Sequence, residues 1–107
     1  MEIKQYQVVL VNLEPTLGSE IKKTRPCVVL SPDEMNQYLN TVVVAPMTTT
    51  DKAYPTRVKV RHKKRDGRIA IDQIRTIDKQ RIIQVSGMLS EKEIHQCKAV
   101  LKATFVD

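Results

Sequence analysis

The hydrophobic residues of this chain fall into short runs separated by polar stretches, a pattern typical of a small protein built mainly from β-strands. The run at 41–46 is almost wholly apolar, which predicts a central strand, and Pro46 is expected to end it because proline cannot donate to a ladder. Charged residues alternate with valine along 57–61, which is typical of a half-exposed strand. The pattern predicts strands at 6–13, 26–30, 41–46, 57–61, 68–72 and 81–89.

Turn-forming residues mark the connections between these strands. Gly18 permits a sharp turn in the loop at 14–24, and Asp66-Gly67 predicts the turn of a hairpin. The polar segment 73–79 is expected to include at most a single turn, and Gly87 indicates a bulge or bend in the last strand. In the connection at 31–40, Ser31 or Asp33 is expected to cap one short helical turn.

A C-terminal helix is predicted by a capping box, in which Ser90 is followed three residues later by Glu93. Its apolar face comprises Ile94, Cys97, Val100, Leu101 and Phe105. Short strands, polar turns and one helix predict a mainly β fold with some α structure, a compact and partly open barrel. The length of 107 residues fits one domain spanning 1–107.

Composition limits the classes of protein and site that we expect. The chain has no apolar run long enough to span a membrane and no apolar signal-peptide core, which favours a cytoplasmic protein with no membrane partner. Cys27 and Cys97 are expected to be free, packed thiols. His62 and His95 stand apart from other ligand types, so we expect structural or surface roles for them, and no metal site. No cofactor motif occurs.

The formal net charge of +6 is concentrated in one segment, residues 57–68. Such a segment suits a polyanion, either a nucleic acid or an acidic protein segment, although a charged hairpin can also be a solvated edge that prevents aggregation. The basic residues are Arg57, Lys59, Arg61, Lys63, Lys64, Arg65 and Arg68, opposed only by Asp66.

Candidate chemistry is limited to hydroxyls, amides and guanidinium groups near strand ends. Arg25 lies where a polar loop enters a rigid strand, and its planar fork of donors fits a phosphate. Thr48 supplies a hydroxyl at the end of the central strand. The residues alone also allow simpler roles. Arg25 can be a surface ion-pair partner of Glu20, and Thr48 can cap a loop.

Four segments of the sequence resemble the signature of the MazF/PemK family of toxin endoribonucleases. They cover nearly the whole chain in the order of the family: 9–16, Gly18–Glu20 with Lys23–Ser31, 45–49 and 72–81. The resemblance implies an SH3-like barrel with a C-terminal helix, in a homodimer. It also implies metal-independent, sequence-specific cleavage of single-stranded RNA, and a MazE-like cognate antitoxin whose acidic segment covers the RNA groove.

The resemblance places the two central catalytic positions on Arg25 and Thr48, with Glu20 as a candidate base. The basic segment 61–68 departs from the shorter turn expected in relatives, and it would lengthen the phosphate track. A toxin of the same fold that binds a protein such as a topoisomerase, and a non-catalytic nucleic-acid-binding barrel, remain alternatives. Expected substrate contacts are Ser19, Thr49, Gln73, Arg75, Thr76, Arg81, Lys63, Lys64 and Arg65.

Overall fold

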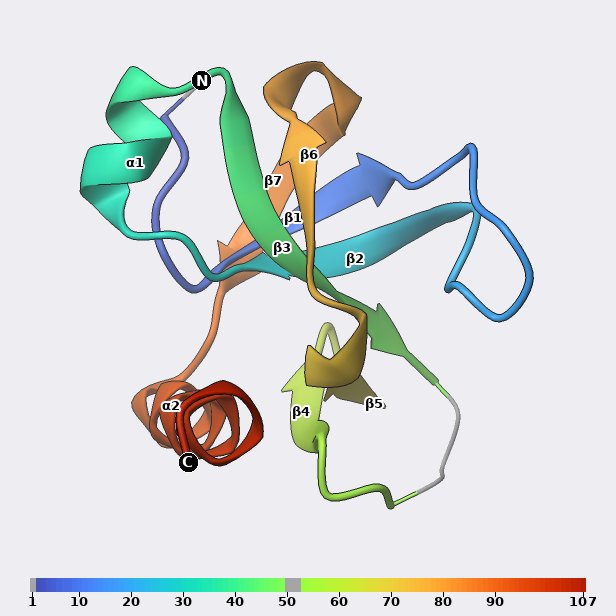
Figure 1. Cartoon of the computed structure of the whole chain (residues 1–107), viewed down its shortest axis with the longest axis vertical. Helices are drawn as coiled ribbons and strands as arrows, with labels where there is room; N and C mark the ends of the chain where they lie inside the picture. Colours follow the sequence, from blue (N-terminus) through green and yellow to red (C-terminus); the bar gives the residue numbers. More distant parts are fainter. Residues whose placement is uncertain (1, 50–52) are drawn as a thin grey trace.

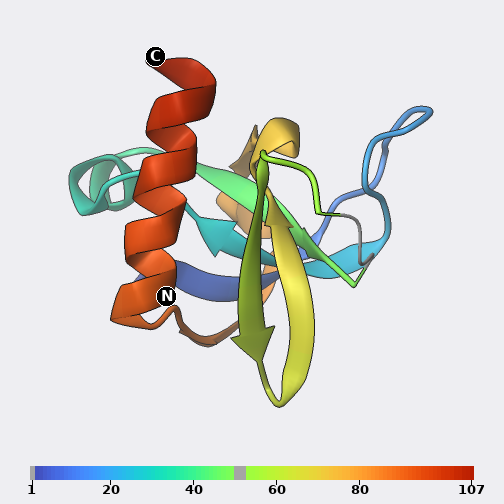
Figure 2. The same ribbon diagram turned by 90° about the horizontal axis from the view of Figure 1, so that it is seen from below.

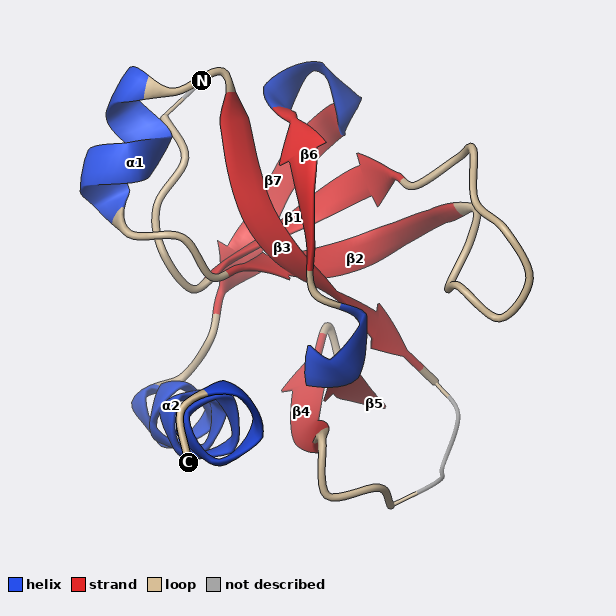
Figure 3. Cartoon of the chain, viewed as in Figure 1, coloured by secondary structure: helices blue, strands red, loops and turns tan. Residues whose placement is uncertain are grey.

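The computed structural model describes residues 2–49 and 53–107, and Figures 1 and 3 show their arrangement. This part of the chain holds seven strands, two α-helices and two 3₁₀ turns. In chain order these are β1 (Gln7–Asn12), β2 (Thr24–Val29), α1 (Asp33–Tyr38), β3 (Thr41–Thr48), β4 (Arg57–His62), β5 (Arg65–Ala70), η1 (Ile71–Gln73), β6 (Arg75–Asp78), η2 (Lys79–Arg81), β7 (Ile82–Met88) and α2 (Glu91–Phe105).

The strands form one strongly curved antiparallel sheet in the order β4-β5-β3-β2-β1-β7, and β6 pairs with β3 off this path. β4 and β7 are the two ends of the path, so the barrel remains partly open between them. The expected mainly β, partly open barrel with a C-terminal helix is confirmed. Among the described residues, no helix is long and apolar enough to cross a membrane.

Both faces of the central strands are buried, which explains their nearly continuous apolar sequence. In β3, Val42 and Val44 belong to one hydrophobic core, whereas Ala45 and Met47 belong to the other. The second of these cores lies against α2, whose Cys97 is fully buried in it. Cys27 is fully buried in the first core, and both thiols are free, as predicted.

Helix α2 begins with the predicted capping box. The Ser90 hydroxyl accepts the Glu93 N–H at 3.2 Å, and the Glu93 carboxylate accepts the Ser90 N–H at 2.9 Å. Ile94, Val100 and Leu101 pack on the core as expected. Phe105 does not, because the last turns of α2 extend beyond the sheet (Figure 2), and its side chain is 56% exposed. The prediction for Phe105 was therefore wrong.

Pro46 does not end β3, contrary to the prediction. It pairs with Cys27 of β2 and lies inside the strand. On its other edge, β3 pairs with β6 as far as Val44 and with β5 only from Met47. Because Pro46 lies at this change of partner, its missing N–H removes no ladder hydrogen bond, and the strand continues to Thr48.

The hairpin turn also differs from the prediction. Lys63 and Lys64 form the two-residue turn, both with positive φ (50° and 65°). Asp66 and Gly67 instead lie in β5, opposite Arg61 and Val60. The glycine is required for another reason, because a Cβ at Gly67 would lie 3.1 Å from the Thr48 carbonyl oxygen. Gly67 therefore permits β5 to approach the end of β3 closely.

Other local expectations had mixed outcomes. Gly87 lies at the predicted bulge, where the register between β1 and β7 shifts. Segment 73–79 contains strand β6, which was missed because β6 is short and polar and is fixed by pairing with β3. Neither proposed cap closes α1, because Asp33 accepts the Gln5 N–H and the Ser31 hydroxyl donates to Asn36.

Candidate active site

A groove of about 410 Å³ is formed by the start of β2, the end of β3, the β4–β5 hairpin and β7. We call it the Arg25–Thr48 groove. It brings together five of the residues predicted from the sequence, from three separate parts of the chain: Arg25, Thr48, Thr49, Lys63 and Arg65.

Arg25 is half-buried at the start of β2, opposite Val11 of β1. Its Nε atom donates to the Lys22 carbonyl oxygen at 3.0 Å, which fixes the plane of the guanidinium group. Within residues 2–49 and 53–107, no ion pair is formed between Arg25 and Glu20. The held guanidinium is therefore available to the groove as a planar set of donors.

Thr48 is the last residue of β3 and is 8% exposed, opposite Arg68 of β5. Thr48 therefore lies in a strand that is paired with β5, rather than in a loop. The groove beside it is positively charged, because Arg25, Lys63 and Arg65 line it. The lining carboxylate, Asp66, is paired with Arg61 at 3.1 Å. The groove is therefore suited to an anionic group.

A second pocket of about 390 Å³ contains a different group of the predicted residues: Ser19, Glu20, Gln73 and Arg75. It adjoins the first groove at β3, where Pro46 lines the second pocket while Met47 and Thr48 line the first. The candidate residues therefore form two neighbouring sites that meet at this strand, rather than one.

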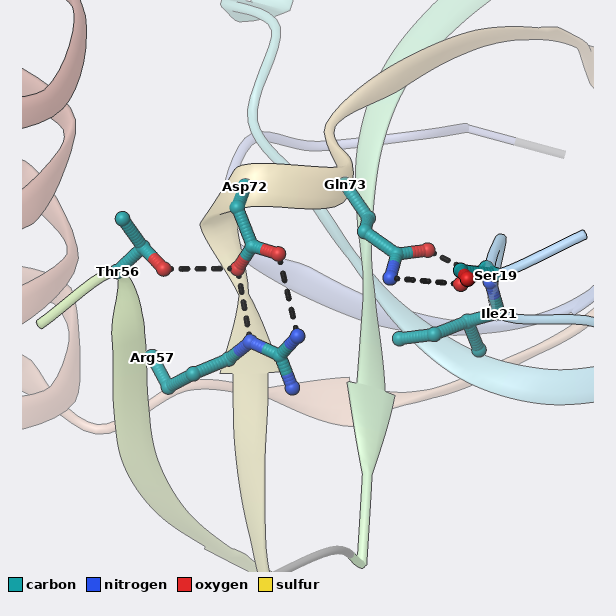
Figure 4. Close-up of polar contacts among 6 residues, drawn as sticks. All are labelled: Ser19, Ile21, Thr56, Arg57, Asp72 and Gln73. Atoms are coloured by element: carbon teal, nitrogen blue, oxygen red, sulfur yellow. Dashed lines mark hydrogen bonds and ion pairs between the residues drawn. The ribbon is translucent and has the colours of Figure 1, made fainter. Parts of the chain in front are cut away.

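Gln73 holds the loop between β1 and β2, as Figure 4 shows. Its Oε1 atom accepts the Ile21 N–H at 2.6 Å, and its Nε2 atom donates to the Ser19 carbonyl oxygen at 3.3 Å. Arg75 donates to the Leu13 carbonyl oxygen at 3.1 Å, at the end of β1. Both side chains thus position the loop that forms a wall of the second pocket.

Asp72 faces the other side of η1 and binds the base of the hairpin (Figure 4). Its carboxylate accepts from Thr56 at 2.9 Å and from two nitrogens of Arg57 at 2.7 and 3.1 Å. The hydrogen bond from Arg57 is the main cause that lowers the pKa of Asp72, and the bond from Thr56 adds to it. The single turn η1 thus connects the hairpin with the β1–β2 loop.

Four other candidates also lie apart from the Arg25–Thr48 groove, in addition to Ser19, Gln73 and Arg75 of the second pocket. The Glu20 carboxylate accepts the Leu17 N–H at 2.5 Å within its own loop, in the second pocket. Thr76 is exposed on β6, and Lys64 is exposed at the hairpin tip; neither lines either pocket. Arg81 donates to the carbonyl oxygens of Asn12 and Glu14, and so supports the start of the β1–β2 loop.

Comparison with known proteins identifies the family. The model of the PemK-like, MazF-like toxin of type II toxin–antitoxin systems matches residues 4–105. The chain belongs to this family. A curated relative of the toxin, Endoribonuclease MazF of Staphylococcus epidermidis, is 39% identical over a match of 98 aligned residues, and the match covers 86% of this chain and 82% of the relative.

Solved structures support the fold of the toxin. MazF from Deinococcus radiodurans is 23% identical with a TM-score of 0.85, and the match covers 96% of each chain. An endoribonuclease from a Mycobacterial species, solved in complex with its cognate antitoxin, is 20% identical with a TM-score of 0.80, covering 94% of this chain and 92% of that one. At these identities the likeness shows the barrel and its C-terminal helix.

Sequence reasoning missed one polar pair in the groove of the toxin. His62 lines the groove, and its Nε2 atom lies 2.9 Å from the Ser86 hydroxyl of β7. The signal was present in the alternation of β4. Val58 and Val60 point inward, so the same period places residue 62 inward as well. The predicted strand at 57–61 ended one residue before this position, with residue 62 left in the connection to the Asp66-Gly67 turn.

Proposed function

We propose that the toxin is an endoribonuclease that cleaves single-stranded RNA, chiefly messenger RNA, at a short specific sequence without a metal ion. The observation that carries the proposal is the meeting of Arg25 and Thr48 in one positively charged groove. Membership of the toxin family and the activity in the name of the 39% identical relative support it.

The proposed reaction uses the RNA's own ribose 2′-hydroxyl as the nucleophile. The 2′-oxygen attacks the adjacent phosphorus and the bond to the 5′-oxygen breaks, which leaves a 2′,3′-cyclic phosphate and a 5′-hydroxyl. Negative charge develops on the phosphate oxygens during this step. Arg25 stabilises that charge with its planar donors, and Thr48 donates to a non-bridging oxygen. DNA lacks the required hydroxyl and is not cleaved.

The remaining candidates extend the binding surface away from the cleaved bond. Lys63, Lys64 and Arg65 follow the hairpin and suit the phosphates of a longer strand. We propose that the second pocket receives nucleotides on one side of the scissile phosphate, where Ser19, Gln73 and Arg75 lie. Further proposed contacts are Thr49, Thr76 and Arg81.

Incubation of the purified toxin with mixed-sequence RNA in EDTA, followed by mapping of the new ends, tests the activity. We expect cuts at one short sequence, each with a cyclic phosphate and a 5′-hydroxyl. Intact RNA across many sequences would contradict the proposal. It would leave a toxin that binds a protein target, or a barrel that binds nucleic acid without cutting it.

Substitution of the two groove residues tests their roles. Arg25→Ala and Thr48→Ala are each expected to remain folded and to lose at least about 100-fold in cleavage rate, the scale for one preorganised donor. Matched controls on the exposed face of α2, Lys98→Ala and Thr104→Ala, are expected to cleave like the wild type. Full activity in either groove variant would refute the role assigned to that residue.

The partners proposed for the toxin follow from charge and exposed surface. The basic groove suits the acidic segment of a MazE-like cognate antitoxin, which would exclude RNA from it. Among the described strands, β7 ends the sheet and has one unpaired edge, and its Ile83 and Met88 are each 54% exposed. We propose that this face contributes to a homodimer, and light scattering is expected to give twice the protomer mass of 12.2 kDa.

A further inference from the structure

We propose that His62 is the general base that accepts the 2′-hydroxyl proton during RNA cleavage in the Arg25–Thr48 groove. This assignment rests on the proposed endoribonuclease activity. The groove already supplies donors for the phosphate through Arg25 and Thr48. The reaction also requires a group that accepts the proton of the ribose 2′-hydroxyl. Glu20, the candidate from the sequence, lies in the second pocket with its carboxylate engaged by the Leu17 N–H.

The position of His62 is fixed by its own strand and by two neighbouring elements. β4 directs it inward, in line with Val58 and Val60. The Glu93 carboxylate of α2 accepts the N–H of the preceding residue, Arg61, at 2.9 Å. On β7, a Cβ added to Gly87 would lie 3.6 Å from the imidazole Cε1 atom, so the ring lies against the bulge. His62 is therefore held at the groove wall rather than exposed at the tip of the turn.

The hydrogen bond to Ser86 can select the imidazole tautomer that a general base needs. When Nε2–H donates to the Ser86 oxygen across 2.9 Å, Nδ1 carries the lone pair of the neutral imidazole. This is the arrangement of a base whose second nitrogen is oriented by a neighbouring group. We assign this tautomer to the active toxin, with Ser86 as a positioning residue.

The other titratable groups that line the groove are less suited to proton uptake. Arg25, Lys63 and Arg65 are cations at neutral pH, and Asp66 is paired with Arg61 and 65% exposed. Burial lowers the pKa of His62 and Lys63 lowers it further, whereas Glu93 raises it. The imidazole is consequently neutral near pH 7, the form that a base requires.

The step balances in atoms and protons. The 2′-hydroxyl proton passes to Nδ1 of His62 as the bond between the 2′-oxygen and phosphorus forms. The bond between phosphorus and the 5′-oxygen breaks, and the 5′-oxygen takes a proton from water. His62 then returns its proton to the solvent. No oxidant, reductant or further reactant is needed.

The test is the pH dependence of kcat/KM for an RNA cleaved by the wild type. We expect the wild-type rate to fall on the acid side with an apparent pKa below the ordinary histidine value of about 6.5. His62→Gln is expected to lose this acid limb and at least about 100-fold in rate, in the range for general-base catalysis. His62→Ala should regain activity on addition of free imidazole. His95→Gln, at the exposed histidine of α2, is the control with an unchanged profile.

Three outcomes separate the possibilities. An active His62→Gln with the wild-type pH profile overturns the role of His62 and leaves the endoribonuclease proposal intact, whereas an inactive wild type contradicts that proposal itself. A slow His62→Ala that free imidazole does not rescue, with the acid limb retained, shows a structural role and also overturns the assignment. If the variants do not fold, NMR titration of the wild-type imidazole decides, because the His62 pKa must match the kinetic one.

Discussion

Removing the Gln73 side chain tests whether η1 holds the wall of the second pocket. In Gln73→Ala, the β1–β2 loop loses a part-buried bond to the Ile21 N–H at 2.6 Å and a longer, exposed bond to the Ser19 carbonyl oxygen at 3.3 Å. Net values of about 0.5–1.5 kcal/mol per bond apply, and the exposed bond belongs at the lower end because water replaces it. We therefore expect the free energy of opening this loop to fall by about 1.5 kcal/mol, or about tenfold in the opening equilibrium.

Amide hydrogen exchange measured residue by residue by NMR is the appropriate assay. The Ile21 amide should lose about tenfold in protection, while amides of β2 and β3 remain as in the wild type. Gln73→Glu should give a smaller loss, because it keeps an acceptor for Ile21 but not the donor to Ser19. Gln96→Ala on α2 is the matched control.

Two results would refute this account of Gln73. Unchanged protection at Ile21 in Gln73→Ala would show that the loop is held by other contacts. An equal loss of protection throughout the sheet would show that Gln73 contributes to global stability rather than to the position of the loop. The loop itself is largely exposed, which is why we expect the global free energy of unfolding to change little.

Two further predictions concern the hairpin. Gly67→Ala places a Cβ 3.1 Å from the Thr48 carbonyl oxygen, a backbone atom that can move only with β3. Urea unfolding should therefore show a free energy of unfolding lower by about 1–3 kcal/mol. A variant as stable as the wild type would contradict this close approach. Because the pKa of Asp72 is lowered from 3.8, its pairing stabilises the fold fully above that value, and the contribution is lost as pH falls toward the folded pKa. Asp72→Asn should therefore flatten the acid limb of the stability curve measured by urea unfolding, and a limb identical to that of the wild type would refute this.

The sequence predicted those parts of the fold that local interactions determine. The capping box of Ser90 and Glu93 is satisfied within one turn, so its signal needs no tertiary information. The apolar run at 41–46 likewise reports burial on both faces of β3. Pro46 was misleading because the effect of a missing N–H depends on which strands lie beside it, and β3 changes partner at that residue.

The candidate site was predictable only in part. Arg25 could be placed at the entry to a strand from Pro26 and the apolar run, but its approach to Thr48 is a consequence of the curved sheet. His62 was missed because the turn of the hairpin was placed three residues too late in the sequence. Asp66-Gly67 is a stronger turn signal than Lys63-Lys64, which adopt positive φ without a glycine or asparagine. Correct placement of the turn would have continued the alternation of β4 to residue 62.

The change of partner along β3 leaves the β4–β5 hairpin as an arm of the sheet. The β4–β5 hairpin joins the sheet through two residue pairs, Met47 with Ile69 and Thr48 with Arg68. The inward residues Val58, Val60 and Ile69 of the hairpin belong to one hydrophobic core, whereas Lys63 and Lys64 at its tip are exposed. Substitutions of these two lysines therefore disturb little of the packing that stabilises the barrel. The charge and length of the tip can therefore vary almost independently of foldability. With the function proposed above, we expect changes in RNA preference to accumulate in this arm while the strands that carry Arg25 and Thr48 remain in place.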